Sequence, residues 1–138
     1  MTLRGAQLRI ARPSRDLDAT IRFYRDGLGL AVLSSFQGHE GFDGVMLGHQ
    51  GDGYHLEFTR AADRRASKAP DEEDLLVFYL PEKSAWERAV ARLAALGHEP
   101  VRSSNPYWDR QGRTFQDPDG HRVVLQRARW GASGLIGK

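Results

Sequence analysis

The segment Tyr54–Thr59 carries an imidazole and a carboxylate, at His55 and Glu57, within a run of alternating apolar and polar residues. Residues two apart on a β-strand point to the same face. We therefore expect Leu56 and Phe58 to pack under a helix, and His55 and Glu57 to face a groove on the other side. A carboxylate and an imidazole on such a face can bind the polar groups of a ligand or contribute to a metal site.

A second group of candidates follows Pro106, where Tyr107 and Trp108 are adjacent in the sequence Asn105-Pro106-Tyr107-Trp108-Asp109. Large aromatic side chains are costly to expose, so both should pack on something. Two interpretations stay open: a lid over the core, or an aromatic wall for a planar ligand. Tyr79 is expected in the same groove, and Arg122 is placed to reach an anionic ligand.

The elements that would position these residues occur twice along the chain. Strand-like segments start at Arg9 and Leu75, and each is followed by an amphipathic helix that ends at a glycine, Gly29 and Gly97. Corresponding positions lie 66 to 68 residues apart. Three further strand-like segments follow each helix, so each half is expected to form a βαβββ unit.

The two expected helices have recognisable ends. The first should run over about residues 17–26, with Asp16 as its N-cap and glycines 27 and 29 supplying the positive φ that ends it. In the second, Ser84 and Glu87 have the spacing of a capping box. Trp86 is expected to lie in the buried stripe of this helix rather than in a site.

Together these patterns predict an α+β fold with two βαβββ units, over about residues 5–62 and 72–128, within one domain of residues 1–138. One helix covers one face of each sheet, so the curled mixed sheets should enclose a groove with the other face. Residues 63–71 are expected to be a linker, and residues 131–138 a flexible tail.

Composition excludes several classes of protein. The 138 residues contain no cysteine, which excludes disulfides and thiolate chemistry. The net charge is +2, and the basic residues near 60–68 are followed by an acidic run, so no nucleic-acid partner is expected. No apolar run has the length of a membrane span and no secretory signal is recognisable, so we expect a cytoplasmic protein without a membrane partner.

The ordered set of motifs resembles the vicinal oxygen chelate superfamily of glyoxalase I, bleomycin-resistance proteins and extradiol dioxygenases. The resemblance covers nearly all of residues 7–127. It is carried by Asp16-Leu17, Phe23-Tyr24 and Gly27-Leu28-Gly29-Leu30 in the first half, and by Tyr107, Gly112 and Phe115-Gln116-Asp117-Pro118-Asp119-Gly120 in the second. It implies two βαβββ units around a pocket with up to four metal-binding side chains.

Carried over to this chain, the ligand positions of the metal-dependent members fall on Arg9, Glu57, Leu75 and Val124. Only Glu57 has a side chain that such a metal site uses. We therefore expect no metal or other cofactor at that place. We further expect the Arg9 guanidinium to occupy part of it and to pair with Glu57. If a metal is bound elsewhere, His39, His55 and Glu57 are the candidates.

The resemblance and the residues favour a small-molecule-binding protein, related to the bleomycin-resistance branch, that binds or sequesters a small organic ligand and forms a homodimer. The expected ligand-binding residues are Arg9, His55, Glu57, Tyr79, Tyr107, Trp108 and Arg122. Two alternatives stay open: a metal-dependent lyase, isomerase or dioxygenase with displaced ligands, and a scaffold without a ligand.

Overall fold

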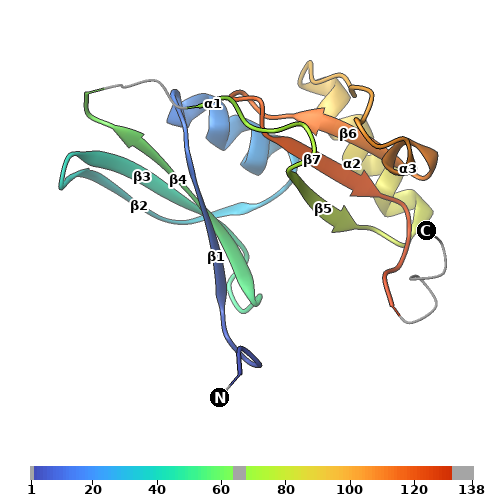
Figure 1. Ribbon diagram of the computed structural model, residues 1–138, viewed down its shortest axis with the longest axis horizontal. Coiled ribbons are helices and arrows are strands. Elements are labelled where there is room, and N and C mark those ends of the chain that lie inside the picture. Colours follow the sequence, from blue (N-terminus) through green and yellow to red (C-terminus); the bar gives the residue numbers. More distant parts are fainter. Residues whose placement is uncertain (1, 64–67, 132–138) are drawn as a thin grey trace. The chain divides into compact units, whose positions relative to one another are not determined.

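The computed structural model describes residues 2–63 and 68–131 and contains two compact units, Met1–Lys68 and Ala69–Lys138 (Figure 1). Residues 64–67 of the expected linker and residues 132–138 of the expected tail lie outside the described residues. Within the described parts, no helix is long and apolar enough to cross a membrane.

The first unit has the βαβββ order that the repeat predicts. Its elements are β1 (Leu8–Pro13), α1 (Leu17–Ile21), the π-helix η1 (Arg22–Gly27), β2 (Ala31–His39), β3 (Phe42–Gly48) and β4 (Tyr54–Ala61). The strand order is β1-β4-β3-β2, with β1 parallel to β4 and the other pairs antiparallel. The sheet is therefore mixed, and β1 and β2 are its two edges.

The helix of the first unit packs on the face of β4 that the alternation predicts. Leu56 and Phe58 are 1% exposed, and the rings of Phe58 and Tyr24 lie 4.7 Å apart. Asp16 caps the helix by accepting a hydrogen bond from the backbone of Ala19. The positive φ after the helix belongs to Gly29 alone; the expected positive φ at residue 27 is wrong, since that residue closes the π-helical turn.

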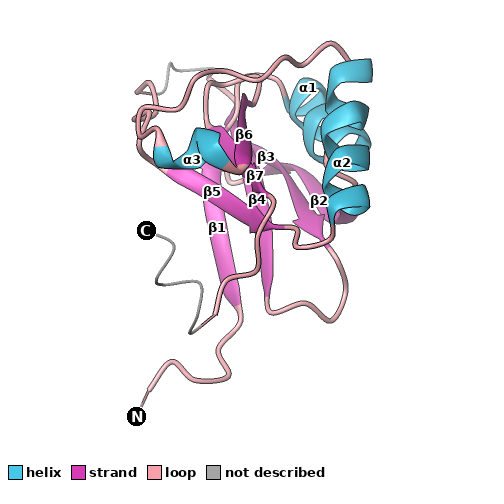
Figure 2. Cartoon of the chain, turned by 90° about the vertical axis from the view of Figure 1, so that its right-hand side faces the viewer, coloured by secondary structure: helices cyan, strands magenta, loops and turns pink. Residues whose placement is uncertain are grey.

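The second unit has a three-stranded sheet of order β5-β7-β6. Its elements are β5 (Leu75–Tyr79), α2 (Lys83–Ala95), the one-turn helix α3 (Tyr107–Arg110), β6 (Gly112–Gln116) and β7 (Arg122–Gln126). β5 is parallel to β7, and β6 is antiparallel to it. Figure 2 shows α2 and α3 on opposite sides of this sheet.

One expected strand of the second unit is reduced to a single bridge between Val101 and Thr114. Two local features explain this. Pro100 has no backbone N–H to donate to a neighbouring strand. The backbone N–H of Ser103 donates to both carboxylate oxygens of Asp109, at 3.2 Å each, and so is bonded to α3 instead of to β6.

The expected capping box of α2 is absent. The helix begins at Lys83, so Ser84 lies inside it, and the Ser84 hydroxyl donates to Glu82 at 2.6 Å instead of capping a backbone N–H. Trp86, which was expected in a buried stripe, is only partly buried. Its indole N–H donates to the carbonyl of Leu125 at 2.8 Å, which fixes the helix to β7.

Candidate functional site

Arg9, His55 and Glu57 form a polar cluster on the face of the first sheet opposite the helix. The Arg9 Nε donates to Nε2 of His55 at 2.9 Å. The Arg9 Nη1 lies 3.5 Å from Oε2 of Glu57. The pairing of Arg9 with Glu57 that the resemblance suggested is thus present, and Arg9 also contacts His55.

Strand register produces this cluster. In the parallel β1–β4 pair, Arg9 is the direct partner of His55, and Ala11 is the direct partner of Glu57. Because Ala11 has only a methyl side chain, the long Arg9 side chain can extend along the strand to Glu57. On the other side of β4, Gly48 leaves room for His55, since a Cβ there would lie 3.0 Å from the Cβ of His55.

The cluster fixes a tautomer and leaves donors open. An imidazole nitrogen that accepts a hydrogen bond carries no proton, so Nε2 of His55 is unprotonated and the ring proton lies on Nδ1. The Arg9 side chain is 47% exposed and that of Glu57 is 14% exposed. The contacts assigned among the described residues use Nε and Nη1, which leaves Nη2 of Arg9 for a ligand.

The donors of this cluster do not fit a divalent metal at the superfamily's usual position. A guanidinium does not lose its proton in proteins, so Arg9 is a permanent cation where the first ligand should be. The Nε2 lone pair of His55, which could bind a metal, accepts from Arg9. In the second unit, the expected positions are Leu75 and Val124, whose side chains have no donor atom.

The alternative metal set is also not brought together. His39 is at the level of Phe42 and Ala61, while His55 is paired with Gly48. Six residues of strand separate these two levels, which is roughly 20 Å. Among the described residues, no three His, Cys, Asp or Glu side chains form a group that could hold a metal ion.

The second unit contains a cavity of about 290 Å³ that brings Tyr79 and Tyr107 together. Sequence reasoning had selected these two but not the remaining lining residues, which are Arg110, Gln111, Gln126, Ala128, Arg129 and Trp130. Trp108 does not line this cavity; its ring packs edge-on against Tyr107 with centroids 4.9 Å apart. Burial, and then the neighbouring Tyr107, raise the pKa of the Tyr79 phenol.

Arg122 is held by its own unit. It is 6% exposed, its Nη1 donates to the carbonyl of Arg102 at 3.0 Å, and its Nη2 lies 3.7 Å from Glu72. These contacts tie β7 to two neighbouring segments. A role for Arg122 in binding an anion stays a prediction.

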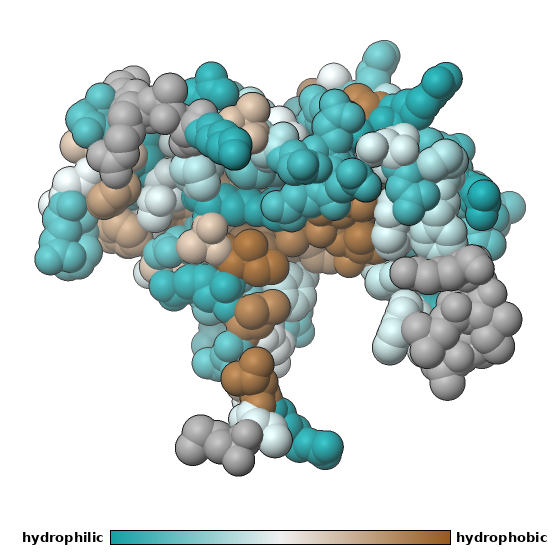
Figure 3. All heavy atoms as spheres, in the orientation of Figure 1, coloured by the Kyte–Doolittle hydropathy of each residue, from teal (hydrophilic) through white to brown (hydrophobic). Residues whose placement is uncertain are grey.

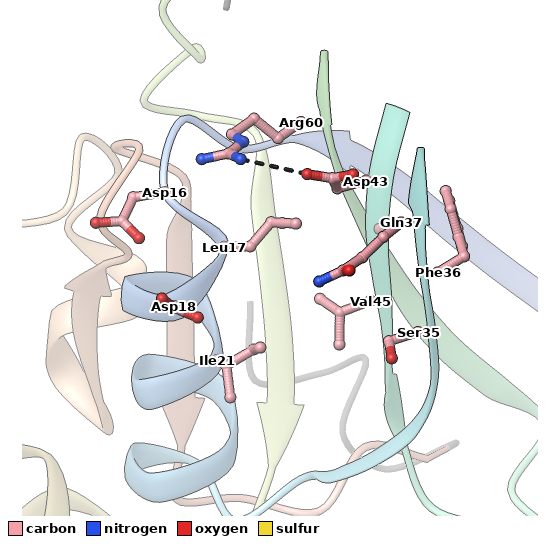
Figure 4. A pocket seen from close by; sticks show the side chains of 11 residues that line it. Asp16, Leu17, Asp18, Ile21, Ser35, Phe36, Gln37, Asp43, Val45 and Arg60 are labelled. Atoms are coloured by element: carbon pink, nitrogen blue, oxygen red, sulfur yellow. Dashed lines mark hydrogen bonds and ion pairs between the residues drawn. The ribbon is translucent and has the colours of Figure 1, made fainter. Parts of the chain in front are cut away.

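A further cavity, of about 330 Å³, lies in the first unit between the start of α1 and the strands β2, β3 and β4 (Figure 4). Three of its lining residues are aspartates, and two of these have structural partners. Asp16 caps α1, and Asp43 forms an ion pair with Arg60 at 3.2 Å and accepts from the backbone of Gly38. The cavity therefore has a negative rim whose charges mainly hold the helix and the hairpin in place.

Comparisons with known proteins identify the family. The model of the YycE-like N-terminal domain matches residues 8–59, and that of the YycE-like C-terminal domain matches residues 73–127. The chain belongs to the YycE-like family. This family lies in the glyoxalase, bleomycin-resistance and fosfomycin-resistance superfamily, so the resemblance stated from the sequence is confirmed, as is the α+β fold with two mixed sheets.

Two matches share 42% sequence identity with this chain. The chain is 42% identical to the uncharacterized protein YycE of Bacillus subtilis (strain 168) over 99% of its own length and 96% of that protein. The crystal structure of a Bacillus subtilis YycE protein has a TM-score of 0.86 and 42% identity, covering 92% of this chain and 93% of that one.

Two more distant structures share the fold alone. Glyoxalase I of Leishmania major has a TM-score of 0.69 at 21% identity, covering 88% of this chain and 86% of that one. TnmS3, an antibiotic-binding protein from Streptomyces sp. CB03234, has a TM-score of 0.62 at 22% identity, covering 91% of this chain and 97% of that one.

The Arg9–Glu57 pair should give a small but measurable coupling. In a double-mutant cycle of Arg9→Gln and Glu57→Gln, we expect a coupling free energy of unfolding of about 0.2–1 kcal/mol, because the pair is partly exposed. The measurement is urea denaturation at low salt and again at high salt, where screening should reduce the coupling. A cycle that pairs Arg4→Gln with Glu57→Gln is the control, and equal coupling in both cycles would contradict the pairing.

Gly112→Ala should disturb the cavity of the second unit. A Cβ at Gly112 would lie 2.4 Å from Oε1 of Gln126 and 2.6 Å from the carbonyl oxygen of Trp108, so α3 or Gln126 must move. We expect a loss of about 1–3 kcal/mol of unfolding free energy, by thermal or urea denaturation. Gly53→Ala is the control, since no atom lies within 4 Å of its Cβ position. Equal stabilities of the two variants would rule out close packing at Gly112.

Proposed function

We propose that this protein binds a small organic molecule without the help of a divalent metal. The observation that carries the proposal is the contact of the Arg9 guanidinium with both His55 and Glu57. In metal-dependent members of the superfamily, the positions of Arg9 and Glu57 hold metal ligands. Here a fixed cation stands in for the metal and can meet a negatively polarised end of a ligand.

Electrostatics supports this reading of the cluster. At 4 Å and an effective dielectric constant of 20, two unit charges interact by roughly 4 kcal/mol, and a divalent ion beside a guanidinium would be repelled by about twice that amount. The same charge attracts a carboxylate, a phosphonate or an enolate oxygen. Arg9 can use Nη2, and His55 its Nδ1 proton, to donate to such a group.

The likeness of fold to TnmS3 supports the same proposal, because that protein binds an antibiotic. The cavity of the second unit supports it as well, since concave sites that combine aromatic side chains with polar groups are typical of small-molecule binding. On this proposal, Arg9, His55 and Glu57 can bind polar groups of a ligand at the first unit, and Tyr79 and Tyr107, backed by Trp108, can contact apolar groups of a ligand in the cavity of the second unit.

We also propose that the protein forms a homodimer. β1 is an edge strand, and its first residue, Leu8, is 55% exposed; Leu3, in the segment that precedes β1, is 87% exposed. Figure 3 shows apolar side chains gathered along the part of the first unit where β1 lies. The opposite edge, β2, exposes Val32 and Leu33 by 41% and 39%. Exposed apolar edges of this kind are usually covered in solution.

Metal content tests the proposal directly. After incubation with manganese, iron, cobalt, nickel and zinc and then desalting, the wild-type protein should retain far less than one metal ion per chain by plasma mass spectrometry. Arg9→His should retain more, because it adds an imidazole beside His55 and Glu57 and removes the cation. Arg9→Gln, which removes the charge without adding a good ligand, is the control.

Stoichiometric metal in the wild type, lost in Glu57→Ala, would overturn the proposal and favour a metal-dependent lyase, isomerase or dioxygenase.

A ligand screen completes the test. Thermal denaturation in EDTA, with a panel of small carboxylates and phosphonates, should find compounds that stabilise the wild type and stabilise Arg9→Gln less. Compounds that stabilise only when a divalent metal is added would contradict the proposal.

A further inference from the structure

We infer that the cavity of the second unit binds a planar aromatic anion that carries a hydrogen-bond donor away from its negative group. This inference rests on the proposed function, because it names the class of molecule that is bound. It concerns the cavity lined by Tyr79, Tyr107, Arg110, Gln111, Gln126, Ala128, Arg129 and Trp130, which we call the aromatic cavity. Three kinds of lining group, aromatic, cationic and amide, support it.

Aromatic rings supply the walls. Tyr79, Tyr107 and Trp130 come from β5, from α3 and from the segment after β7, so three separate parts of the unit converge. Tyr79 is 36% exposed and Trp130 is 56% exposed, which is unusual for rings of this size. The edge-on contact of Trp108 supports Tyr107 from behind. Rings held in this way offer stacking and edge contacts to a flat ligand.

Charge in the aromatic cavity is entirely positive. Arg110 and Arg129 line it, and none of its described lining residues is acidic. The nearest carboxylate on α3, that of Asp109, is bound by the backbone of Ser103. The cavity of the first unit, by contrast, is lined by three aspartates and one arginine. The aromatic cavity therefore selects anions, and a guanidinium can bind a carboxylate in the bidentate manner.

Gln126 is the residue that we expect to select ligands with a hydrogen-bond donor. It is 2% exposed, lines the aromatic cavity, and its Oε1 has no hydrogen-bond partner among the described residues. Buried amide oxygens are normally paired, and this one is enclosed beside Gly112, so a ligand that brings a donor can satisfy it once the Gln126 side chain turns its oxygen toward the cavity. Gly112 makes the arrangement possible, because any side chain there would collide with that oxygen.

The size of the aromatic cavity limits the ligand. A volume of about 290 Å³ is close to the lower end of the range for ligand pockets. It suits a ring system of one or two fused rings, with the anionic group at the arginines and an N–H or O–H group at Gln126. A cationic amine or a long aliphatic chain would not match these walls.

The test uses four naphthalene probes and isothermal titration calorimetry. 6-Hydroxy-2-naphthoate has both the anion and the donor, 6-methoxy-2-naphthoate lacks the donor, 2-naphthoate lacks the substituent, and 2-naphthol lacks the anion. We expect the hydroxy acid to bind at least fivefold more tightly than the methoxy acid, by the usual worth of a hydrogen bond. Equal or tighter binding of the methoxy acid would overturn the role of Gln126.

Variants locate the binding. Gln126→Leu should remove the preference for the hydroxy acid over 2-naphthoate while leaving 2-naphthoate affinity nearly unchanged. Arg110→Gln and Arg129→Gln should each weaken the carboxylates severalfold but not 2-naphthol. Arg113→Gln is the matched control, because Arg113 lies over Trp86 on the α2 side of the sheet. A loss in Arg113→Gln equal to that in the other two would show that net charge alone is responsible and would overturn the inference.

Failure of this inference is distinguishable from failure of the proposed function. If none of the four probes binds but carboxylates from the thermal screen do so in EDTA, the ligand class assigned to the aromatic cavity is wrong and the metal-independent binding function stands. If probes bind only after a divalent metal is added, both proposals fail. Folding of each variant is checked by its denaturation midpoint in the absence of probe.

Discussion

The structure of the first unit's open face depends on one side chain, the guanidinium of Arg9. It makes a hydrogen bond to an imidazole and an ion pair with a carboxylate, and both partners lie on the same strand. This geometry requires the parallel pairing of β1 with β4 in one register only, because a shift of β1 by one residue would turn Arg9 to the helix side. The helix side is closely packed with Phe58 and Tyr24, which makes that shift costly.

The two units differ in the side chains that their sheets carry, although both follow the order of strand, helix and returning strands. The first places polar and charged side chains on its open face. The second places its aromatic rings, two arginines and a buried amide around a cavity, and uses Arg122 to hold the sheet to neighbouring segments.

Much of this arrangement follows from the sequence. The repeat predicts the element order, and the alternation in Tyr54–Thr59 predicts which side chains pack under the helix. The strand after α2 could not be predicted, because its loss depends on the Asp109 carboxylate binding Ser103. The capping box at Ser84 failed for a similar reason, since Glu82 binds its hydroxyl. Helix and strand propensities and residue spacing do not show when a side chain competes for a hydrogen bond in this way.

The candidate site was predictable in part. Arg9 and Glu57 were found because a family pattern aligned them, and Tyr79 and Tyr107 because aromatic residues stand out. Gln126 was not among the expected ligand-binding residues, and its unpaired oxygen becomes visible only when Gly112 lies beside it in the sheet. Arg110 and Arg129 gave no signal, because surface arginines are common and only the fold brings these two to one cavity.

The most direct test of the account is the state of the His55 imidazole, by nitrogen-15 NMR of histidine- and arginine-labelled protein near pH 8. We expect a proton on Nδ1, an unprotonated Nε2, and a scalar coupling across the hydrogen bond from Nε of Arg9, all unchanged by added zinc or manganese. A protonated Nε2 without such a coupling would contradict this expectation. So would a resonance of Nε2 that shifts or broadens on stoichiometric metal, because the imidazole would then be a metal ligand.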